Sequence, residues 1–261
     1  MDVLSPLSLE EALRLKAERR DAVPIAGGTD VMVAINFDRL RPGTVLNLEE
    51  VDELRGWSRE NGTVRLGARA TYTELMAPDA AAALPALAEA ARTVGSPQIR
   101  NRGTVGGNLG TASPAGDALP PLLVYGAEVE LASTRGSRTA PLRDFLVGPK
   151  RNALEQDELI VAVRIPVPGP RQTFMKVGPR NAMVIAVVSL ALVVDGDELR
   201  ASYGSAGPVP GLVTAPVEER DTFPEQVAEA ASPIDDVRGT ARYRRHALRV
   251  LTERALERSL A

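Results

Sequence analysis

Residues 94–120 read VGSPQIRNRGTVGGNLGTASPAGDALP, and the centre of this stretch is a glycine segment, TVGGN, at 104–108. An earlier glycine segment, AGGTD, occupies 26–30. Each segment joins an apolar run to a stretch with helical character. Because glycine lets the backbone take φ > 0 and lets a ligand approach the main chain, consecutive peptide N–H groups there can point at one phosphate. Two such segments predict a diphosphate held from both sides.

Taken alone, either segment is also compatible with a simple glycine turn between a strand and a helix. The spacing matches neither the dinucleotide fingerprint G-x-G-x-x-G nor the phosphate loop G-x-x-x-x-G-K-[ST], which disfavours a Rossmann half and a nucleotide-hydrolysing loop. No lysine or arginine falls between residues 23 and 38. A phosphate at the first segment would therefore meet peptide N–H groups and the positive end of a helix dipole.

The composition is that of an ordinary globular chain of 261 residues, with 44% hydrophobic and 25% charged residues. A formal net charge of −3 and an aromatic content of 3% argue against a nucleic-acid surface. No apolar run approaches the roughly 20 residues that cross a bilayer. The first residues lack a basic region followed by an apolar core, so we expect no signal peptide and a cytoplasmic protein.

Redox and metal chemistry are limited by the residue types present. The chain has no cysteine and a single histidine, His246. This excludes a cysteine-ligated iron–sulfur cluster, a structural zinc site of the usual kind, a disulfide framework and a thiol nucleophile within the chain. Any redox chemistry must come from a bound organic cofactor, and we predict neither a catalytic side chain nor a metal ligand.

Local signals predict mixed helices and strands. Capping boxes begin at Ser8 and at Thr71, and Asn61-Gly62 favours a hairpin turn. We expect Trp57, beside this hairpin, to lie in the core. The expected helices cover 8–20, 30–37, 80–93, 117–125, 224–231 and 240–258, and the expected strands cover 23–26, 44–48, 57–59, 64–66, 127–132, 158–165, 172–178 and 198–205.

Prolines and Gly169 crowd residues 166–170 and predict a linker, because prolines at this density remove hydrogen-bond donors and stop both helix and sheet. We therefore expect an α+β chain of three units, at residues 1–56, 57–168 and 171–261. After the second glycine segment, Asn108 can donate to a phosphate or a ribityl hydroxyl. Asp117 can accept from a hydroxyl group or cap the next helix.

Five stretches together resemble the flavin-binding medium subunit of molybdenum hydroxylases, the group that contains carbon monoxide dehydrogenase and xanthine dehydrogenase. They are AGGTD at 26–30, the run at 94–120, DFLVGP at 144–149, FMKVGPR at 174–180 and RGTARYRRHAL at 238–248. The resemblance extends over essentially the whole chain. It implies a two-subdomain FAD-binding fold of the vanillyl-alcohol-oxidase-like (PCMH) type, followed by a smaller C-terminal sheet-and-helix domain.

The resemblance also implies which residues bind FAD. Asp117 matches an acidic contact, and Ile160 and Lys176 match residues near the flavin; an ammonium at Lys176 would suit an anionic reduced ring. Val94 matches a further contact position or is simply core. The diphosphate would be held by Ile25, Ala26, Gly27, Gly28, Thr29, Asp30 and Val31 on one side, and by Thr104, Val105, Gly106, Gly107 and Asn108 on the other.

Two positions carry no functional role in this reading. Val184 stands where many relatives have an aspartate, and His246 is expected on a helix surface or at an interface. The implied function is an electron-transfer subunit that accepts electrons from an iron–sulfur small subunit, fed by a molybdenum-cofactor large subunit. The FAD would pass them to NAD or another acceptor. The alternatives are a non-catalytic binding or assembly module and a stand-alone flavin oxidoreductase.

Overall fold

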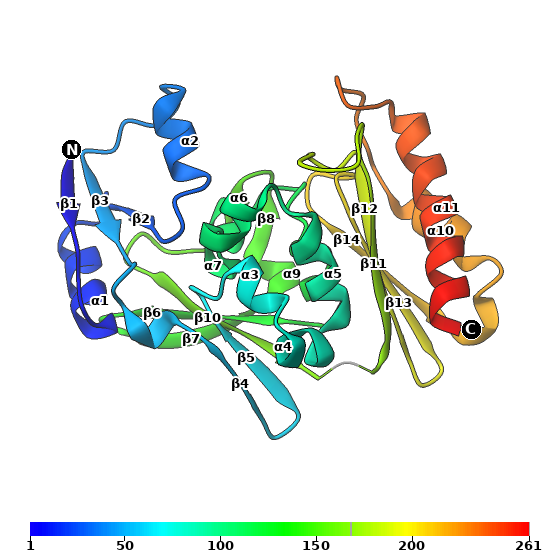
Figure 1. Ribbon diagram of the computed structural model, residues 1–261, viewed down its shortest axis with the longest axis horizontal. Coiled ribbons are helices and arrows are strands. Elements are labelled where there is room, and N and C mark those ends of the chain that lie inside the picture. The colour runs from blue at the N-terminus through cyan, green and yellow to red at the C-terminus, as the bar shows by residue number, and fades with distance from the viewer. Residues whose placement is uncertain (168, 261) are drawn as a thin grey trace.

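The computed structural model describes residues 1–167 and 169–260. The three larger of the four sheets that these residues form follow one another along the long axis of the molecule (Figure 1). The first is parallel, in the order β1-β3-β2, and consists of β1 (Asp2–Leu4), β3 (Thr44–Asn47) and β2 (Val23–Ile25). Its helices are α1 (Leu9–Glu18) and α2 (Val31–Asn36). The predicted order of strand, glycine turn and helix is therefore present at β2 and α2.

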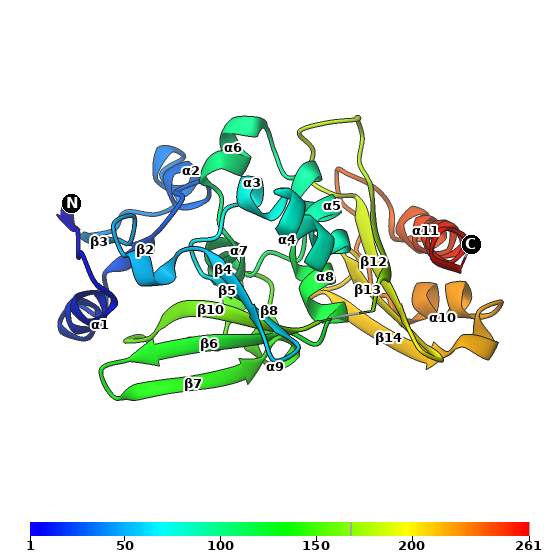
Figure 2. The ribbon, with the colours of Figure 1, turned by 60° about the horizontal axis from the view of Figure 1, so that its bottom comes forward.

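The central sheet is antiparallel, in the order β4-β5-β10-β6-β7. Helices and two short strands complete this unit, and α3 to α7 lie above the sheet in Figure 2. The strands are β4 (Trp57–Glu60), β5 (Thr63–Gly67), β6 (Glu128–Ser133), β7 (Gly136–Pro141) and β10 (Leu159–Pro166). The other elements are a 3₁₀ turn (Asp52–Leu54), α3 (Tyr72–Leu75), α4 (Pro78–Ala83), α5 (Pro85–Thr93), α6 (Pro97–Arg102), α7 (Val105–Thr111), α8 (Leu119–Val124), α9 (Leu142–Phe145), β8 (Leu146–Gly148) and β9 (Arg151–Asn152).

Two expectations about this region are wrong. The single helix expected at 80–93 is two helices, because Pro85 has no N–H to donate and starts α5, while Leu84 leaves helical geometry at φ −135°. Trp57 is 37% exposed on the edge strand β4, whose residues all face solvent, so it is not a core residue. The hairpin itself forms as expected, with Asn61 and Gly62 both at positive φ.

The C-terminal sheet is an antiparallel meander of β11 (Arg171–Val177), β12 (Val188–Asp195), β13 (Glu198–Gly204) and β14 (Gly211–Pro216). A 3₁₀ turn (Val217–Glu219), α10 (Phe223–Ala230) and α11 (Ala241–Leu260) follow. Seven consecutive residues of β12 are buried, because α11 packs against this strand together with β11, while α8 packs against it together with β13. Leu190 and Leu192 join the core under α11, whereas Ala191 and Val193 join the core of the central unit.

The C-terminal sheet is thus packed against α5 and α8 of the central unit, and Val94 directly after α5 and Asp117 just before α8 line the cavity described below. Pro168 of the expected linker lies outside the described residues. The mixed helix and strand content agrees with the predicted α+β class. Within the described part of the chain, no helix is long and apolar enough to cross a membrane.

Candidate functional site

A cavity of about 740 Å³ collects the predicted site residues from separate parts of the chain. This volume lies within the range of roughly 300–1,000 Å³ typical of ligand pockets. Thirteen of the fifteen predicted residues line it; Val105 and Lys176 do not. The lining residues are Ile25, Ala26, Gly27, Gly28, Thr29, Asp30, Val31, Thr104, Gly106, Gly107, Asn108, Asp117 and Ile160.

The first glycine segment, residues 26–30, supplies peptide donors. It leaves β2 at Ile25, passes through Gly28 at φ +74° and enters α2 at Val31. Among residues 1–167 and 169–260, no protein acceptor bonds the peptide N–H groups of residues 26–30. Gly27 is required sterically, because a Cβ there would lie 1.7 Å from the carbonyl oxygen of Arg102. Five consecutive donors are therefore available to an anion.

The second glycine segment, residues 104–108, differs from the expectation. Thr104 is the N-cap of α7, and its hydroxyl accepts from the Gly107 N–H at 3.0 Å. The N–H groups of Val105, Gly106 and Asn108 bond the carbonyls of Ala70, Ala68 and Thr104 at 3.0, 2.8 and 3.0 Å. Helix formation and packing against the chain after β5 use the N–H groups of residues 105–108, so the expectation that these groups point at a phosphate is wrong; among the described residues, the Thr104 N–H has no protein acceptor.

The glycines of α7 allow close packing instead. A Cβ on Gly106 would lie 2.7 Å from the Cβ of Ala68, so this glycine lets the helix sit directly on the chain after β5. A Cβ on Gly107 would lie 3.0 Å from the Thr104 hydroxyl oxygen. Because Gly107 has no side chain, a ligand in the cavity can approach the backbone at this wall closely. Val105 is fully buried in the core.

Two buried oxygens at the cavity wall have no protein partner among the described residues. They are Oδ1 of Asn108 and Oδ1 of Asp117. Buried polar atoms are nearly always hydrogen-bonded, so two oxygens without partners at the same cavity indicate contacts with a ligand. Asp117 does not cap α8, whose N-cap is Ala118 without a side-chain bond. The alternative role of Asp117 as a helix cap is therefore absent.

Lys176 lies behind Asp117 rather than in the cavity. Its Nζ donates to Asp117 Oδ2 at 2.5 Å and to the Thr93 carbonyl at 3.2 Å, and both ionic side chains are almost fully buried. The Thr93 hydroxyl also donates to Asp117 Oδ2, at 3.2 Å. Burial raises the pKa of Asp117, and the ammonium of Lys176 opposes this rise.

Part of the cavity wall is apolar. Val94 and Ile160 form it together with Leu154, and the loop between β11 and β12 brings Met183, Val184 and Ile185 to the same cavity. Met183 and Ile185 are 57% and 63% exposed. No role was predicted for this loop. The available signal was the length of the apolar run at 182–194, which exceeds the strand that begins only at Val188.

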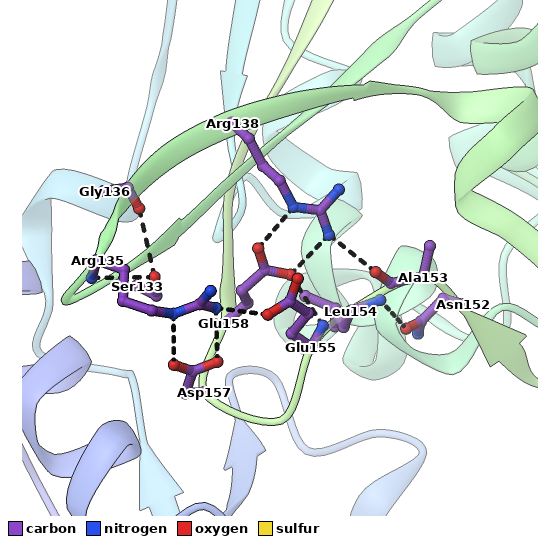
Figure 3. A network of polar contacts seen from close by, with 10 residues as sticks. All are labelled: Ser133, Arg135, Gly136, Arg138, Asn152, Ala153, Leu154, Glu155, Asp157 and Glu158. Atoms are coloured by element: carbon purple, nitrogen blue, oxygen red, sulfur yellow. Dashed lines mark hydrogen bonds and ion pairs between the residues drawn. The ribbon is translucent and has the colours of Figure 1, made fainter.

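An ion-pair network fixes the wall that carries Ile160 (Figure 3). Arg138 on β7 donates two hydrogen bonds to Glu158, at 2.6 and 2.7 Å, and Glu158 itself lines the cavity. Arg135 holds Asp157 at 3.0 Å in the same way. The Arg138 guanidinium holds the pKa of Glu158 below its usual range. The network ties the segment before β10 to the β6–β7 hairpin and was not predicted.

Few basic side chains line the cavity, so a phosphate there would be bound mainly by peptide N–H groups. Of the described residues that line the cavity, Arg69 is the only lysine or arginine, whereas Asp30, Asp117 and Glu158 are acidic. The cavity thus has free peptide donors at residues 26–30, oxygens of Asn108 and Asp117 without a protein partner among the described residues, and an apolar part of its wall. This donor set fits FAD, an amphipathic molecule with an anionic diphosphate and a planar ring.

Fold and site define an FAD-binding unit of the molybdenum-hydroxylase type. Residues 1–168 match the profile of the family described as FAD binding domain in molybdopterin dehydrogenase, and the chain belongs to this family. FAD is therefore its cofactor, and the chain is an oxidoreductase subunit.

Similarity to individual relatives extends over nearly the whole chain. The xanthine dehydrogenase FAD-binding subunit of Escherichia coli O157:H7 is 31% identical over 97% of this chain and 94% of its own length. The carbon monoxide dehydrogenase medium chain of Afipia carboxidovorans is 30% identical over 100% of this chain and 96% of its own. The crystal structure of a Cu,Mo-CO dehydrogenase superposes with a TM-score of 0.92 at 28% identity, covering 99% of this chain and 97% of that chain.

Proposed function

We propose that this chain is the FAD-bearing electron relay of a molybdenum hydroxylase complex. In this proposal it receives electrons from an iron–sulfur small subunit, which is fed by a molybdenum-cofactor large subunit, and delivers them to NAD or another acceptor. The observation that supports it most is that one cavity is lined both by free peptide donors and by apolar side chains, some of which are exposed. FAD supplies the ability to take up and release electrons, and the chain supplies binding, orientation and access.

The residue assignments follow from the cavity. We assign the diphosphate to the peptide N–H groups of residues 26–30, flanked by Ile25 and Val31. The second glycine segment supplies the opposite wall, in which Gly107 permits close approach and Asn108 offers its side chain to a phosphate or a hydroxyl. Ile160 and Val94 contact the ring, and Asp117 accepts a hydrogen bond from the cofactor through Oδ1.

Lys176 acts on the cofactor through Asp117 in this proposal. Its ammonium is engaged by Asp117 Oδ2, so the ion pair holds the carboxylate in place and favours its charged form. A charged Asp117 accepts hydrogen bonds only, whereas a protonated one also donates. Lys176 therefore sets which hydrogen-bonding role Asp117 takes toward the cofactor.

Exposed apolar side chains beside the cavity support an obligatory partner. None of the residues of α2 is buried, although five of its six are apolar. Phe37, which follows α2, is 68% exposed, and Ile99 of α6 is exposed as well. In Figures 1 and 2, α2, α6 and the loop between β11 and β12 lie on the same side of the molecule. Exposed apolar surface of this kind marks protein interfaces, and we assign this side to the iron–sulfur subunit.

Purification of the protein with its neighbouring gene products tests the proposal. We expect a yellow chain that releases FAD and co-purifies with an iron–sulfur protein and a molybdenum protein. A colourless chain that FAD cannot reconstitute would support a binding or assembly module instead. Full turnover of a small substrate by the isolated chain would support a stand-alone flavin oxidoreductase. NAD as the acceptor is tested by mixing NAD with the substrate-reduced complex and recording the return of the oxidised flavin spectrum.

A further inference from the structure

Arg244 of α11 is a buried charge that the cofactor site does not explain. It belongs to the segment RGTARYRRHAL at 238–248 and is 1% exposed. Its Nη1 donates to the carbonyl oxygen of Ser205 at 2.5 Å, and its Nη2 donates to Asp236 Oδ1 at 2.5 Å. One guanidinium thus holds two segments that are separate in the sequence. Each of these segments leads to a wall of the cavity.

The first connection runs through Ser205 to the segment that carries Asp117. The Ser205 N–H donates to the Pro114 carbonyl at 2.8 Å, while Arg244 holds the Ser205 carbonyl. Ser205 lies at φ +60°, a left-handed conformation that is uncommon for a residue other than glycine. Ser113 and Ala115 on either side of Pro114 line the cavity. Arg244 therefore holds the carbonyl group of the turn at Ser205, and the N–H group of the same residue is bonded to this wall of the cavity.

The second connection runs through Asp236 to the loop between β11 and β12. Asp236 accepts from Arg238 at 2.6 and 3.1 Å, and Arg238 Nη1 donates to the Ala186 carbonyl at 3.4 Å. Burial alone would raise the pKa of Asp236, but the hydrogen bonds from Arg238 and Arg244 outweigh it and hold that pKa well below its usual range. Ala186 is fully buried and directly follows the cavity-lining Ile185.

Arginine is suited to this place for a geometric reason. Its planar fork presents several donors in fixed directions, so it can hold a carbonyl and a carboxylate at once, whereas lysine is a single point of charge on a flexible stem. An apolar residue of similar size would fill the same space without the cost of burying a charge. The specific contribution of the guanidinium is therefore its hydrogen bonds to these two acceptors.

We propose that Arg244 is a positioning residue that holds two parts of the cavity wall: the segment before Asp117, through Ser205, and the loop between β11 and β12, through Asp236 with Arg238. The C-terminal helix α11 thereby shapes the flavin end of the site without touching the cofactor. This inference rests on the proposed assignment of FAD to the cavity. It gives the RGTARYRRHAL segment a role that the cavity lining alone does not show.

The test compares FAD with ADP on the apo-protein, because ADP carries the diphosphate but no flavin. We expect R244K to weaken FAD binding about tenfold, equivalent to about 1.4 kcal/mol, to leave ADP affinity unchanged and to alter the visible circular dichroism of bound FAD. R245K is the matched control, since Arg245 is its exposed neighbour on α11, and it should behave as wild type. Unchanged FAD affinity in R244K, or equal losses for FAD and ADP, would overturn the proposal.

A second variant keeps the proposal testable if R244K fails to fold. R238K leaves Arg244 in place but removes the fork that joins Asp236 to Ala186, and Arg238 is partly exposed. It should weaken FAD and spare ADP, and an unchanged FAD affinity in R238K would contradict the second connection. If the wild-type protein itself bound no FAD, the proposed cofactor assignment would fail before this inference was reached.

Discussion

The substitution Gly27→Ala tests whether the first glycine segment holds the cofactor through its backbone. A Cβ at this position would lie 1.7 Å from the carbonyl oxygen and 2.5 Å from the carbonyl carbon of Arg102, where ordinary contact begins at 3.4 Å. The obstacle is the backbone that leads into α7, which cannot rotate away as a side chain would. The two glycine segments must therefore move apart to accept one methyl group.

This movement has a calculable effect on FAD binding. Hydrogen bonds from peptide N–H groups work over about 2.7–3.2 Å, so a shift of ångström size breaks those at its centre. A hydrogen bond to a charged group contributes about 1.5–3 kcal/mol, and the loss of two would remove about 3–6 kcal/mol of binding free energy. At about 1.4 kcal/mol per factor of ten, FAD affinity should fall roughly 10²- to 10⁴-fold.

Titration of the apo-protein with FAD, followed by flavin fluorescence, measures this loss. G43A is the matched control, because a Cβ on Gly43 meets nothing within 4 Å and Gly43 is not among the residues with positive φ. Thermal unfolding of both variants shows whether the chain remains folded. A folded G27A protein that binds FAD as tightly as G43A would refute the reasoning.

Three further predictions concern the ion pairs and the exposed apolar side. Phe37→Asp should abolish co-purification of the iron–sulfur partner while FAD content stays at the wild-type level, and Leu7→Asp, at a residue that is similarly exposed (72%), should change neither. Arg138→Gln should lower the free energy of unfolding, measured with urea, by roughly 1.5–3 kcal/mol, because it leaves the buried Glu158 carboxylate without its charged partner; unchanged stability would mean that the network in Figure 3 contributes nothing. Because the folded-state pKa of Asp236 is lowered, its stabilising contribution is present above about pH 3.9, the usual Asp value, and is lost as the pH falls through the folded pKa. Wild type should therefore lose unfolding free energy relative to D236N on going from pH 7 to acid, and parallel pH profiles of the two proteins would disprove this.

Local signals were sufficient for much of the fold. Capping boxes and turn dipeptides act within a few residues, so the starts at Ser8 and Thr71 and the hairpin at Asn61 were readable. The break at Pro85 is equally local, but the alanine-rich pattern on both sides of it predicts one continuous helix. The exposure of Trp57 was not readable, since it depends on β4 being an edge strand.

Most residues that line the cavity could be predicted from the sequence, but their interactions could not. Whether a peptide N–H is free depends on partners far away in the sequence, such as the carbonyl of Ala68 that Gly106 bonds. The position of Lys176 behind Asp117 likewise depends on how β11 packs against α5. The sequence therefore predicted two similar phosphate-binding segments. The structure instead has one segment of free peptide donors, which faces a closely packed turn of α7.

A crystal structure of the chain with FAD tests this central asymmetry most directly. We predict that the diphosphate oxygens accept hydrogen bonds from peptide N–H groups of residues 26–30. The N–H groups of residues 105–108 should keep the protein partners that they have now. A diphosphate bonded instead to the N–H groups of Gly106 and Gly107, or one lying away from both glycine segments, would contradict the account.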